Sequence, residues 1–251
     1  MSYNRPIVLS LAGFDPCGGA GVLADIKTFE QHQCLGMAIN TAITRQVEDE
    51  FISVEWLSLH TIIDQLKTLT DRYDIHFVKI GIIENLDTLL EVVSYLKQQN
   101  KHVAIVWDTV LSASGGFNFI ETLDKEKLKA LLKNIRLITP NVNEVKKLSG
   151  LAHETDAAID LASYCHVLLK GGHSKENEGV DFLFSGDRVT EIKKQTSKII
   201  YPKHGSGCIL SAAITSQLAL GNDLETACQK AKQYIETLLN SNSNLLAYHV
   251  A

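Results

Sequence analysis

The sequence has few cysteines, few aromatic residues and no excess of basic residues. Its five cysteines are an odd number, are widely spread and include no Cys-x-x-Cys pair, which argues against a disulfide framework or a zinc knuckle. The 24 basic residues are outnumbered by 29 acidic ones, so a nucleic-acid-binding face is not expected. The longest apolar runs are strand-sized, well below the roughly 18 residues that a membrane span needs.

These absences leave a globular protein without an internal boundary. The hydrophobic share of 45% is far too high for a disordered chain. No proline-rich linker, charge run or repeat divides the sequence, so residues 1–251 are predicted to form one domain. The polar segment 1–6 leads into an apolar run of only six residues, which does not resemble a signal peptide, and we expect the protein to be cytoplasmic.

Short apolar runs alternate with amphipathic segments along the whole chain. The predicted strands are 7–12, 76–80, 103–107, 135–138 and 167–169, with a hairpin of 179–185 and 188–192. The predicted helices are 22–33, 85–98, 143–148, 157–164, 208–220 and 224–239. This alternation indicates an α/β fold with a mainly parallel sheet covered by helices on both faces. Ligands bind such sheets at the carboxyl ends of the strands.

The segment after the first strand, 13–21, contains four glycines in nine residues. Glycines allow positive φ angles and a close approach of backbone to a ligand. Their spacing matches neither the phosphate-binding loop nor the dinucleotide fingerprint. The segment is therefore either a ligand-contacting loop or an ordinary strand-to-helix turn.

Charged and polar residues follow three later strands. Asp108 can hold Mg²⁺ through water, or cap a helix. Asn141 and Glu144 have the spacing of a helix capping box, which can also hold a carboxylate near a metal-bound triphosphate. Lys170, beside paired glycines, suits a phosphate group, although a surface lysine in a turn is the simpler interpretation.

A Gly-x-Gly turn, residues 205–207, leads into the apolar helix that begins at Cys208. The unpaired N–H groups and the positive end of the helix dipole form an anion hole suited to a phosphoryl group in transit. The same field lowers the pKa of a thiol, so Cys208 is a candidate thiolate that accepts a proton. The alternative is a buried cysteine that acts only as a small hydrophobe.

The order of these motifs resembles the hydroxymethylpyrimidine/phosphomethylpyrimidine kinases of thiamine biosynthesis, within the ribokinase-like superfamily. The resemblance runs over nearly the whole chain and is carried by Ala12–Gly21, Ala24–Thr28, Val78–Gly81, Asp108–Val110, Thr139–Asn141 with Glu144, Lys170–His173 and His204–Cys208. It implies a three-layer α/β/α fold with a small β flap, for which 35–44 and 51–57 are the candidate segments.

The resemblance implies an ATP- and Mg²⁺-dependent kinase that phosphorylates 4-amino-5-hydroxymethyl-2-methylpyrimidine and then its monophosphate. By position, Cys208 is the base and Lys170 contacts phosphate. The implied anion hole consists of Gly205, Ser206 and Gly207. The residues implied near Mg²⁺ and ATP are Asp108, Asn141 and Glu144. The implied substrate contacts are Gln46, Asp25, Gly13, Ala20, Val110 and Ile82. The family also suggests a homodimer.

The chain departs from the family pattern around the substrate. The family usually has Thr-Ala-Gln-Asn where this chain has Thr44-Arg45-Gln46-Val47, and serine is common at the position of Cys17. Arg45 beside the glutamine that reads the pyrimidine edge leaves a vitamin B6 kinase with the same base as an alternative. A non-catalytic pyrimidine-binding regulator is a further alternative, against which the retained Cys208 and Lys170 argue.

Overall fold

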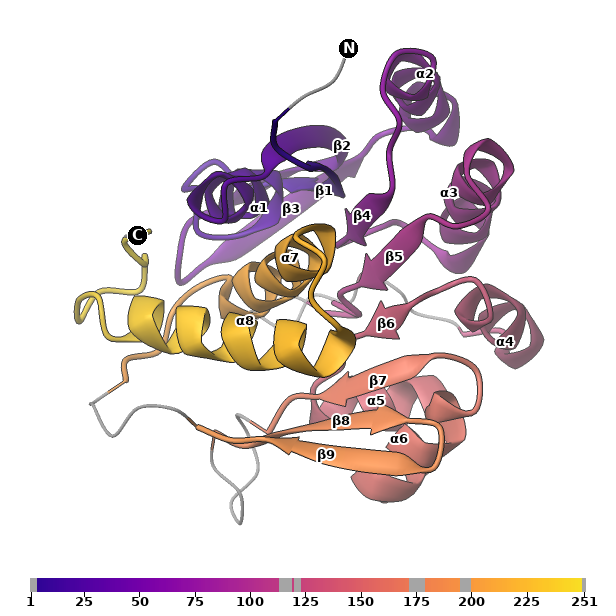
Figure 1. Cartoon of the computed structure of the whole chain (residues 1–251). Coiled ribbons are helices and arrows are strands. Elements are labelled where there is room, and N and C mark those ends of the chain that lie inside the picture. The colour runs from indigo at the N-terminus through magenta and orange to yellow at the C-terminus, as the bar shows by residue number, and fades with distance from the viewer. Residues whose placement is uncertain (1–3, 113–118, 120–122, 172–178, 195–199, 250–251) are drawn as a thin grey trace.

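The computed structural model describes residues 4–112, 119, 123–171, 179–194 and 200–249. Within them the chain forms one nine-stranded sheet with helices on both faces (Figure 1). The strands are β1 (Ile7–Phe14), β2 (Leu35–Gln46), β3 (Phe51–Trp56), β4 (Phe77–Ile80), β5 (Ala104–Trp107), β6 (Leu137–Ile138), β7 (His166–Leu169), β8 (Asp181–Ser185) and β9 (Arg188–Ile192). The helices are α1 (Gly21–Gln31), α2 (Leu59–Thr70), α3 (Leu86–Gln99), α4 (Lys125–Leu132), α5 (Val142–Ser149), α6 (Glu154–Ala162), α7 (Ser206–Ala219) and α8 (Leu224–Leu239).

The strand order is β3-β2-β1-β4-β5-β6-β7-β8-β9. The strands from β2 to β7 in this order run parallel, and the antiparallel strands β3, β8 and β9 lie at the two ends. The chain places β2 on one side of β1 and β4 on the other side. The strand order therefore reverses between β1 and β4, and such a switch point leaves a crevice at the carboxyl ends of the strands.

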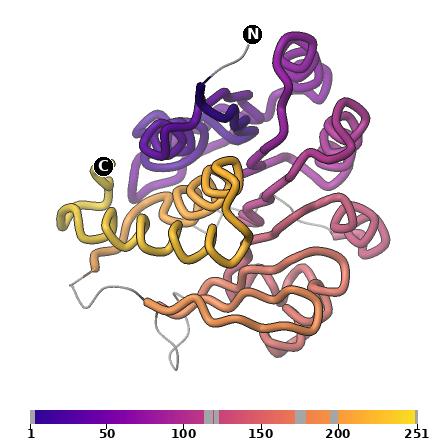
Figure 2. The backbone as a smooth tube through the Cα atoms, viewed as in Figure 1, coloured from indigo at the N-terminus to yellow at the C-terminus, as the bar shows by residue number. Residues whose placement is uncertain are grey.

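The helices form two layers around the sheet. Helices α1, α7 and α8 cover one face, and α2 to α6 cover the other (Figure 1). Helix α7, near the end of the chain, lies beside α1, near its beginning (Figure 2). Because α7 contacts α1, α8 and the sheet, every residue from 209 to 218 is buried, which explains its apolar or small side chains on all sides.

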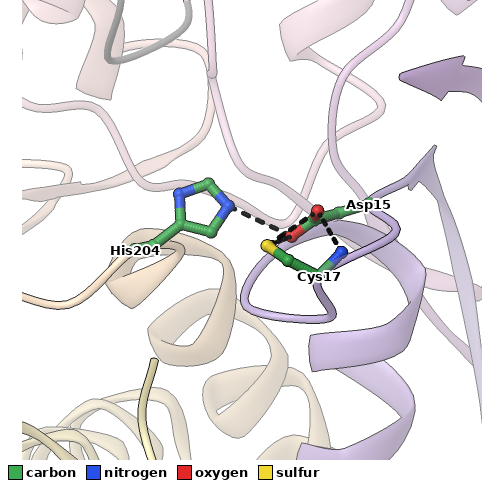
Figure 3. Close-up of side chains that lie close together, drawn as sticks. All are labelled: Asp15, Cys17 and His204. Atoms are coloured by element: carbon green, nitrogen blue, oxygen red, sulfur yellow. Dashed lines mark hydrogen bonds and ion pairs between the residues drawn. The ribbon is translucent and has the colours of Figure 1, made fainter. Parts of the chain in front are cut away.

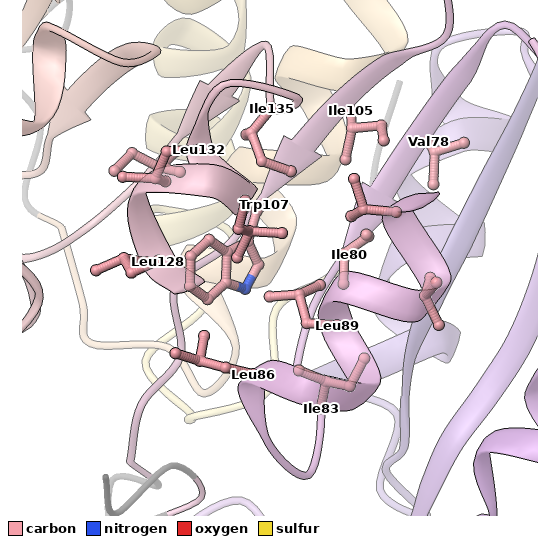
Figure 4. Close-up of a cluster of buried hydrophobic side chains, with 14 of the residues drawn as sticks. Val78, Ile80, Ile83, Leu86, Leu89, Ile105, Trp107, Leu128, Leu132 and Ile135 are labelled. Atoms are coloured by element: carbon pink, nitrogen blue, oxygen red, sulfur yellow. The ribbon is translucent and has the colours of Figure 1, made fainter. Parts of the chain in front are cut away.

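The larger core cluster lies under α3 and α4 and surrounds Trp107, the last residue of β5 (Figure 4). The Trp107 side chain is only 1% exposed. Its cluster includes Leu86 and Leu89 from α3 and Leu128 and Leu132 from α4. Since Asp108 follows Trp107 directly, this packing fixes the backbone from which the Asp108 carboxylate projects.

The structure confirms the predicted α/β arrangement, whereas α2 and α4 were not predicted from the sequence. Segment 35–44, expected in a small flap, is mostly a strand of the central sheet, because β2 pairs in parallel with β1 from Leu35 to Ile43. Only the end of β2, from Ala42 onward, pairs with β3, and this edge hairpin corresponds to the expected flap. Among the described residues, none of the helices is both long enough and apolar enough to cross a membrane.

Candidate active site

Most of the implied site residues lie at the carboxyl ends of the central strands. Loop 15–20 follows β1, Ile82 follows β4, Asp108 follows β5 and Lys170 follows β7. The N-terminus of α7 reaches the same edge of the sheet, because its N-cap Gly205 packs against the loop after β1. Gly172 and His173, which belong to the same motif as Lys170, lie outside the described residues.

Asp108 and Lys170 form an ion pair at the centre of this edge. The Lys170 Nζ lies 3.2 Å from Asp108 Oδ1 and 3.8 Å from Glu144 Oε2. Thr139 donates a hydrogen bond to Asp108 Oδ1 at 3.0 Å, and Ser211 donates one to Oδ2 at 3.2 Å. Burial alone would raise the pKa of Asp108, but the nearby ammonium groups, foremost that of Lys170, hold it below its ordinary value. The carboxylate is therefore ionised and anchored from β6, β7 and α7.

Glu144 is placed by the capping box at the start of α5. The Asn141 side chain accepts the N–H groups of Asn143 and Glu144, and Glu144 Oε2 accepts the N–H of Asn141 at 2.8 Å. Thr109 also donates to Glu144 Oε2, at 3.3 Å. Burial raises the pKa of Glu144 above its ordinary value, although Lys170 opposes that effect. The capping interpretation of this motif is confirmed, and the cap brings a second carboxylate next to Lys170.

The Gly-x-Gly turn before α7 is tightly packed on the loop after β1. Gly205 has a φ of 73°, in the left-handed region that favours glycine. A Cβ at Gly205 would overlap the carbonyl oxygen of Gly19 and lie 2.8 Å from Ala20 Cα. A Cβ at Gly207 would lie 3.3 Å from the Lys170 Nζ. The turn thus lies between the loop after β1 and the Asp108–Lys170 pair.

The N-terminus of α7 has the uncapped donors that an anion hole requires. No side chain caps it among the described residues. The same holds for α1 and α6, whereas α2, α3, α4, α5 and α8 begin with a side-chain cap. The N–H of Ser206 donates weakly to the carbonyl of Lys203, at 3.4 Å. The N–H groups of Gly207 and Cys208 follow in the first turn, where a helix has no internal acceptor for them. Gly207 lies beside the Lys170 ammonium, which makes the turn suitable for a phosphoryl group.

Cys208 lies in the first turn of α7, but its thiol does not have the lowered pKa that the sequence suggested. Burial raises the pKa of Cys208 to about 11, and the negative charges of Asp108 and Asp25 act in the same direction. The ammonium of Lys79 and the N–H of Gly21 oppose this increase. In the ligand-free protein burial thus acts against the thiolate that the sequence suggested, and the role of Cys208 as base stays a prediction.

Lys79 and Asp25 form a fully buried ion pair at the switch point, between β4 and α1. The Lys79 Nζ lies 3.0 Å from Asp25 Oδ1 and 2.9 Å from Oδ2, and neither side chain is exposed. Ser10 donates a further hydrogen bond to Asp25 at 2.6 Å. Burial alone would lower the pKa of Lys79, but the charges of Asp25 and Cys208 raise it well above its ordinary value. Lys79 is therefore a charged group that interacts electrostatically with the Cys208 thiol.

Asp25 was expected to line the substrate pocket, and the structure places it differently. Its carboxylate has no exposed surface, and the Lys79 ammonium and the Ser10 hydroxyl occupy its oxygens. Asp25 thus contributes to the site through Lys79, which it holds in place and keeps charged.

Asp15 and His204 connect the two loops that border the site (Figure 3). Asp15 Oδ2 accepts the N–H groups of Gly19 and Ala20 and lies 3.1 Å from His204 Nε2. Burial would raise the pKa of Asp15, but the hydrogen bonds from His204, Cys17 and Ala20 lower it to about 2. The ionised carboxylate therefore ties the loop after β1 to the residue that precedes the Gly-x-Gly turn.

The remaining implied substrate contacts lie beside the loop after β1. A Cβ at Gly13 would overlap the Ile82 side chain and lie 3.7 Å from Thr44 Cγ2. Thr44 and Gln46 lie on the same face of β2, because Gln46 Nε2 donates to Thr44 Oγ1 at 2.8 Å. Arg45 between them is exposed, at a register shift in the pairing of β2 with β3.

The direction of the Gln46 amide follows from two hydrogen bonds. The Thr44 hydroxyl donates its only hydrogen to the Phe14 carbonyl at 2.9 Å, so it can only accept from Gln46. The Gln46 NH₂ group therefore faces Thr44, and its carbonyl oxygen and second N–H are available to a ligand. Val110, the last implied contact, is partly exposed in the loop after Asp108.

Sequence reasoning missed several functional neighbours, and one of them left a detectable signal. Lys79 stands inside the apolar run of β4, where a charged residue needs a buried partner. Thr139 and Ser211, which anchor Asp108, carry no signal of that kind.

A cavity of about 360 Å³ lies elsewhere, among residues that include Phe77, Arg136 and Leu218, and none of the implied site residues lines it.

Comparison with known proteins identifies the family of this chain. A family model described as phosphomethylpyrimidine kinase matches residues 15–251. A hydroxymethylpyrimidine/phosphomethylpyrimidine kinase from Staphylococcus aureus is 32% identical over 239 residues, which cover 91% of this chain and 86% of that protein. The crystal structure of phosphomethylpyrimidine kinase from Clostridium difficile 630 matches with a TM-score of 0.76 and 32% identity, over 92% of this chain and 98% of that one.

A second structural neighbour is the ADP complex of Bacillus subtilis pyridoxal kinase, with a TM-score of 0.81 and 27% identity, over 94% of this chain and 92% of that one. The resemblance drawn from the sequence motifs is confirmed, as is a kinase with the ribokinase-like α/β fold. The chain belongs to the phosphomethylpyrimidine kinase family.

Proposed function

We propose that this kinase phosphorylates the hydroxymethyl group of 4-amino-5-hydroxymethyl-2-methylpyrimidine, and then the resulting monophosphate, with ATP as donor and Cys208 as base. The observation that carries the proposal is the assembly of Cys208, the uncapped turn before it, Lys170 and Asp108 at one edge of the sheet. Phosphoryl transfer needs mainly positioning and charge stabilisation, which these groups supply.

The transferred phosphoryl group is bound by the N-terminus of α7 and by Lys170. The N–H groups of Gly207 and Cys208 are proposed to donate to the developing negative charge, and the Lys170 ammonium adds a full positive charge beside Gly207. Burial alone would lower the pKa of Lys170, but Asp108 and Glu144 raise it well above its ordinary value. Lys170 is therefore charged in the ligand-free protein.

Asp108 and Glu144 fit the role of magnesium ligands, directly or through water. Both are buried carboxylates that lie within 4 Å of the same Lys170 ammonium, and oxygen donors are what Mg²⁺ prefers. When bound, Mg²⁺ neutralises charge on the ATP phosphates. Asn141 contributes by fixing Glu144 through the capping box.

Cys208 accepts the proton of the substrate hydroxyl group. In the ligand-free protein the thiol is protonated at neutral pH, because burial raises its pKa to about 11. The Lys79 ammonium favours the thiolate form, and Asp25 holds that ammonium in place. We propose that Lys79 is the positioning residue that makes proton transfer to Cys208 favourable once substrate is bound.

Gln46 is proposed to read the edge of the aminopyrimidine ring. Its carbonyl oxygen and second N–H offer an acceptor beside a donor, because Thr44 holds the other N–H. A ring edge with an exocyclic amino group next to a ring nitrogen presents the complementary donor and acceptor. Vitamin B6 stays the alternative substrate, since Arg45 adjoins Gln46 and a pyridoxal kinase is a structural neighbour.

A coupled ADP-release assay tests the assignment with the aminopyrimidine alcohol, its monophosphate and pyridoxal. We expect turnover of both pyrimidines, and loss of turnover in Cys208→Ala with pyrimidine binding retained in calorimetry. Turnover of pyridoxal alone would replace the substrate assignment. An unchanged rate in Cys208→Ala would remove this residue from the mechanism.

The protein is further proposed to work as a homodimer in the cytoplasm. Three large apolar side chains are exposed on the edge hairpin, namely Ile43, Val47 and Ile52, each between 45% and 50% exposed. All five cysteines are free, which suits a reducing compartment. Light scattering coupled to size exclusion, on the natural protein and on Ile43→Lys, tests the dimer.

A further inference from the structure

Three side chains with different metal-binding atoms meet beside the site, at Asp15, Cys17 and His204 (Figure 3). Their ligand atoms all lie within 4.8 Å of one another. Asp15 Oδ2 lies 3.1 Å from His204 Nε2, and Asp15 Oδ1 lies 3.1 Å from Cys17 Sγ. Ligands at about 2.0–2.3 Å from a tetrahedral zinc ion are separated by about 3.3–3.7 Å, so little movement is needed.

We propose that Asp15, Cys17 and His204 bind a thiophilic divalent cation, for which zinc is the test ion, and that its binding inhibits the kinase. A sulfur and an imidazole ligand select zinc over magnesium, which prefers oxygen ligands. The site is therefore chemically distinct from the Asp108–Glu144 pair.

The carboxylate of this cluster is held in place before any ion binds. Asp15 is 1% exposed and accepts the backbone N–H groups of Cys17, Gly19 and Ala20 at 3.1, 3.0 and 2.8 Å. Hydrogen bonds of this kind orient a ligand and raise metal affinity. Cys17 is partly exposed and the His204 side chain is 11% exposed, so an ion and a fourth ligand from solvent can reach the cluster.

Metal binding replaces two protons that now lie between the ligands. The Cys17 S–H bond breaks, its proton passes to solvent, and the sulfur forms the bond to zinc. The His204 proton that faces Asp15 moves through solvent from Nε2 to Nδ1, so that Nε2 binds the ion. No electron is transferred, and one proton is released for each ion bound.

The position of the cluster connects occupancy to activity. Two of its ligands belong to the loop after β1, and the third, His204, directly precedes the Gly205 turn. An ion bound to both segments would therefore restrict movement of Gly19 and Ala20 relative to the Gly205 turn, which receives the phosphoryl group. This coupling rests on the proposed function, whereas the binding of zinc does not.

Zinc titration of the nucleotide-free protein by calorimetry tests the site directly. We expect one ion per chain, and at least about a tenfold loss of affinity in Cys17→Ser, since disturbing even an indirect metal contact costs that much. Serine keeps the hydrogen bond to Asp15, and equal melting temperatures show that the fold is unchanged. Cys165→Ser, at another partly exposed cysteine, is the matched control and is expected to bind like the natural protein.

Cobalt supplies an independent signature of the sulfur ligand. A thiolate charge-transfer band in the near ultraviolet is expected with cobalt in the natural protein and in Cys165→Ser, and its loss is expected in Cys17→Ser. Absence of zinc binding, or equal binding in Cys17→Ser, overturns the proposed site.

The inhibitory effect needs its own measurement. In the presence of excess Mg-ATP, zinc is expected to inhibit the natural enzyme at least about tenfold more strongly than Cys17→Ser, in line with the affinity difference, and a chelator restores the rate. Equal inhibition of both proteins refutes the coupling and places the inhibitory ion elsewhere. Absence of any kinase activity would refute the proposed function and leave the calorimetric result in force.

Discussion

Replacement of Lys79 by methionine tests the buried ion pair beneath the candidate base. Methionine has a similar length and fills the same space without a charge. In the Lys79→Met variant, Asp25, which has no exposed surface, keeps the Ser10 hydroxyl as its one side-chain hydrogen-bond partner among the described residues. A buried carboxylate is then left without its counter-charge.

The expected loss of stability is large for a single substitution. Removing one partner of a buried ion pair costs about 3–5 kcal/mol, because the other charge stays desolvated. At about 2–4 °C per kcal/mol for a chain of this size, the melting temperature should fall by roughly 6–20 °C. Urea unfolding followed by circular dichroism at neutral pH gives the free energy, and calorimetry gives the melting temperature.

Two control variants separate the pair from general effects of losing a lysine. Lys127→Met removes an exposed ion pair to Asp87 that is even shorter, at 2.6 Å, and should cost less than about 1 kcal/mol because solvent screens both charges. Asp25→Asn combined with Lys79→Met removes both charges and should be more stable than Lys79→Met alone. A loss below about 1 kcal/mol in Lys79→Met, or additive effects in the double variant, would refute this reasoning.

Other substitutions probe the turn, the cap and the base. Gly205→Ala should lower both the melting temperature and kcat, because its Cβ overlaps the Gly19 carbonyl. The control is Gly186→Ala, where φ is similar but the space around the Cβ is open, and it should lower the free energy of unfolding by only about 1–2 kcal/mol. Asn141→Ala should destabilise the protein by about 0.5–2 kcal/mol in urea unfolding and raise the magnesium requirement of the enzyme, and an unchanged requirement would contradict the role of the cap. The logarithm of kcat/KM should rise from neutral to alkaline pH, because the thiolate of Cys208 is the active form and burial raises its pKa to about 11. A value of kcat/KM that falls over that range would indicate a different base.

The alternation of apolar runs and amphipathic segments was enough to predict the α/β fold, because strand and helix periods are local properties of the chain. The capping box of Asn141 and Glu144 was readable for the same reason, since its partners are three residues apart. The parallel sheet then placed Asp108 and Lys170 at one edge, 62 residues apart in sequence, because both follow parallel strands. Helix α4 escaped prediction because its short sequence is rich in lysine and buries only three leucines.

Tertiary structure alone decided which charges meet and which are desolvated. Lys79 and Asp25 are 54 residues apart, and Asp15 and His204 are 189 apart, so no local spacing indicates either pair. The pKa of Cys208 depends on burial and on the charges of Lys79, Asp108 and Asp25, all distant in sequence, so its position at a helix N-terminus was not enough to predict the shift. The sequence by itself determined the fold and the order of the chemical groups along it. Folding determined their partners, because desolvation and charge pairing act through space rather than along the chain.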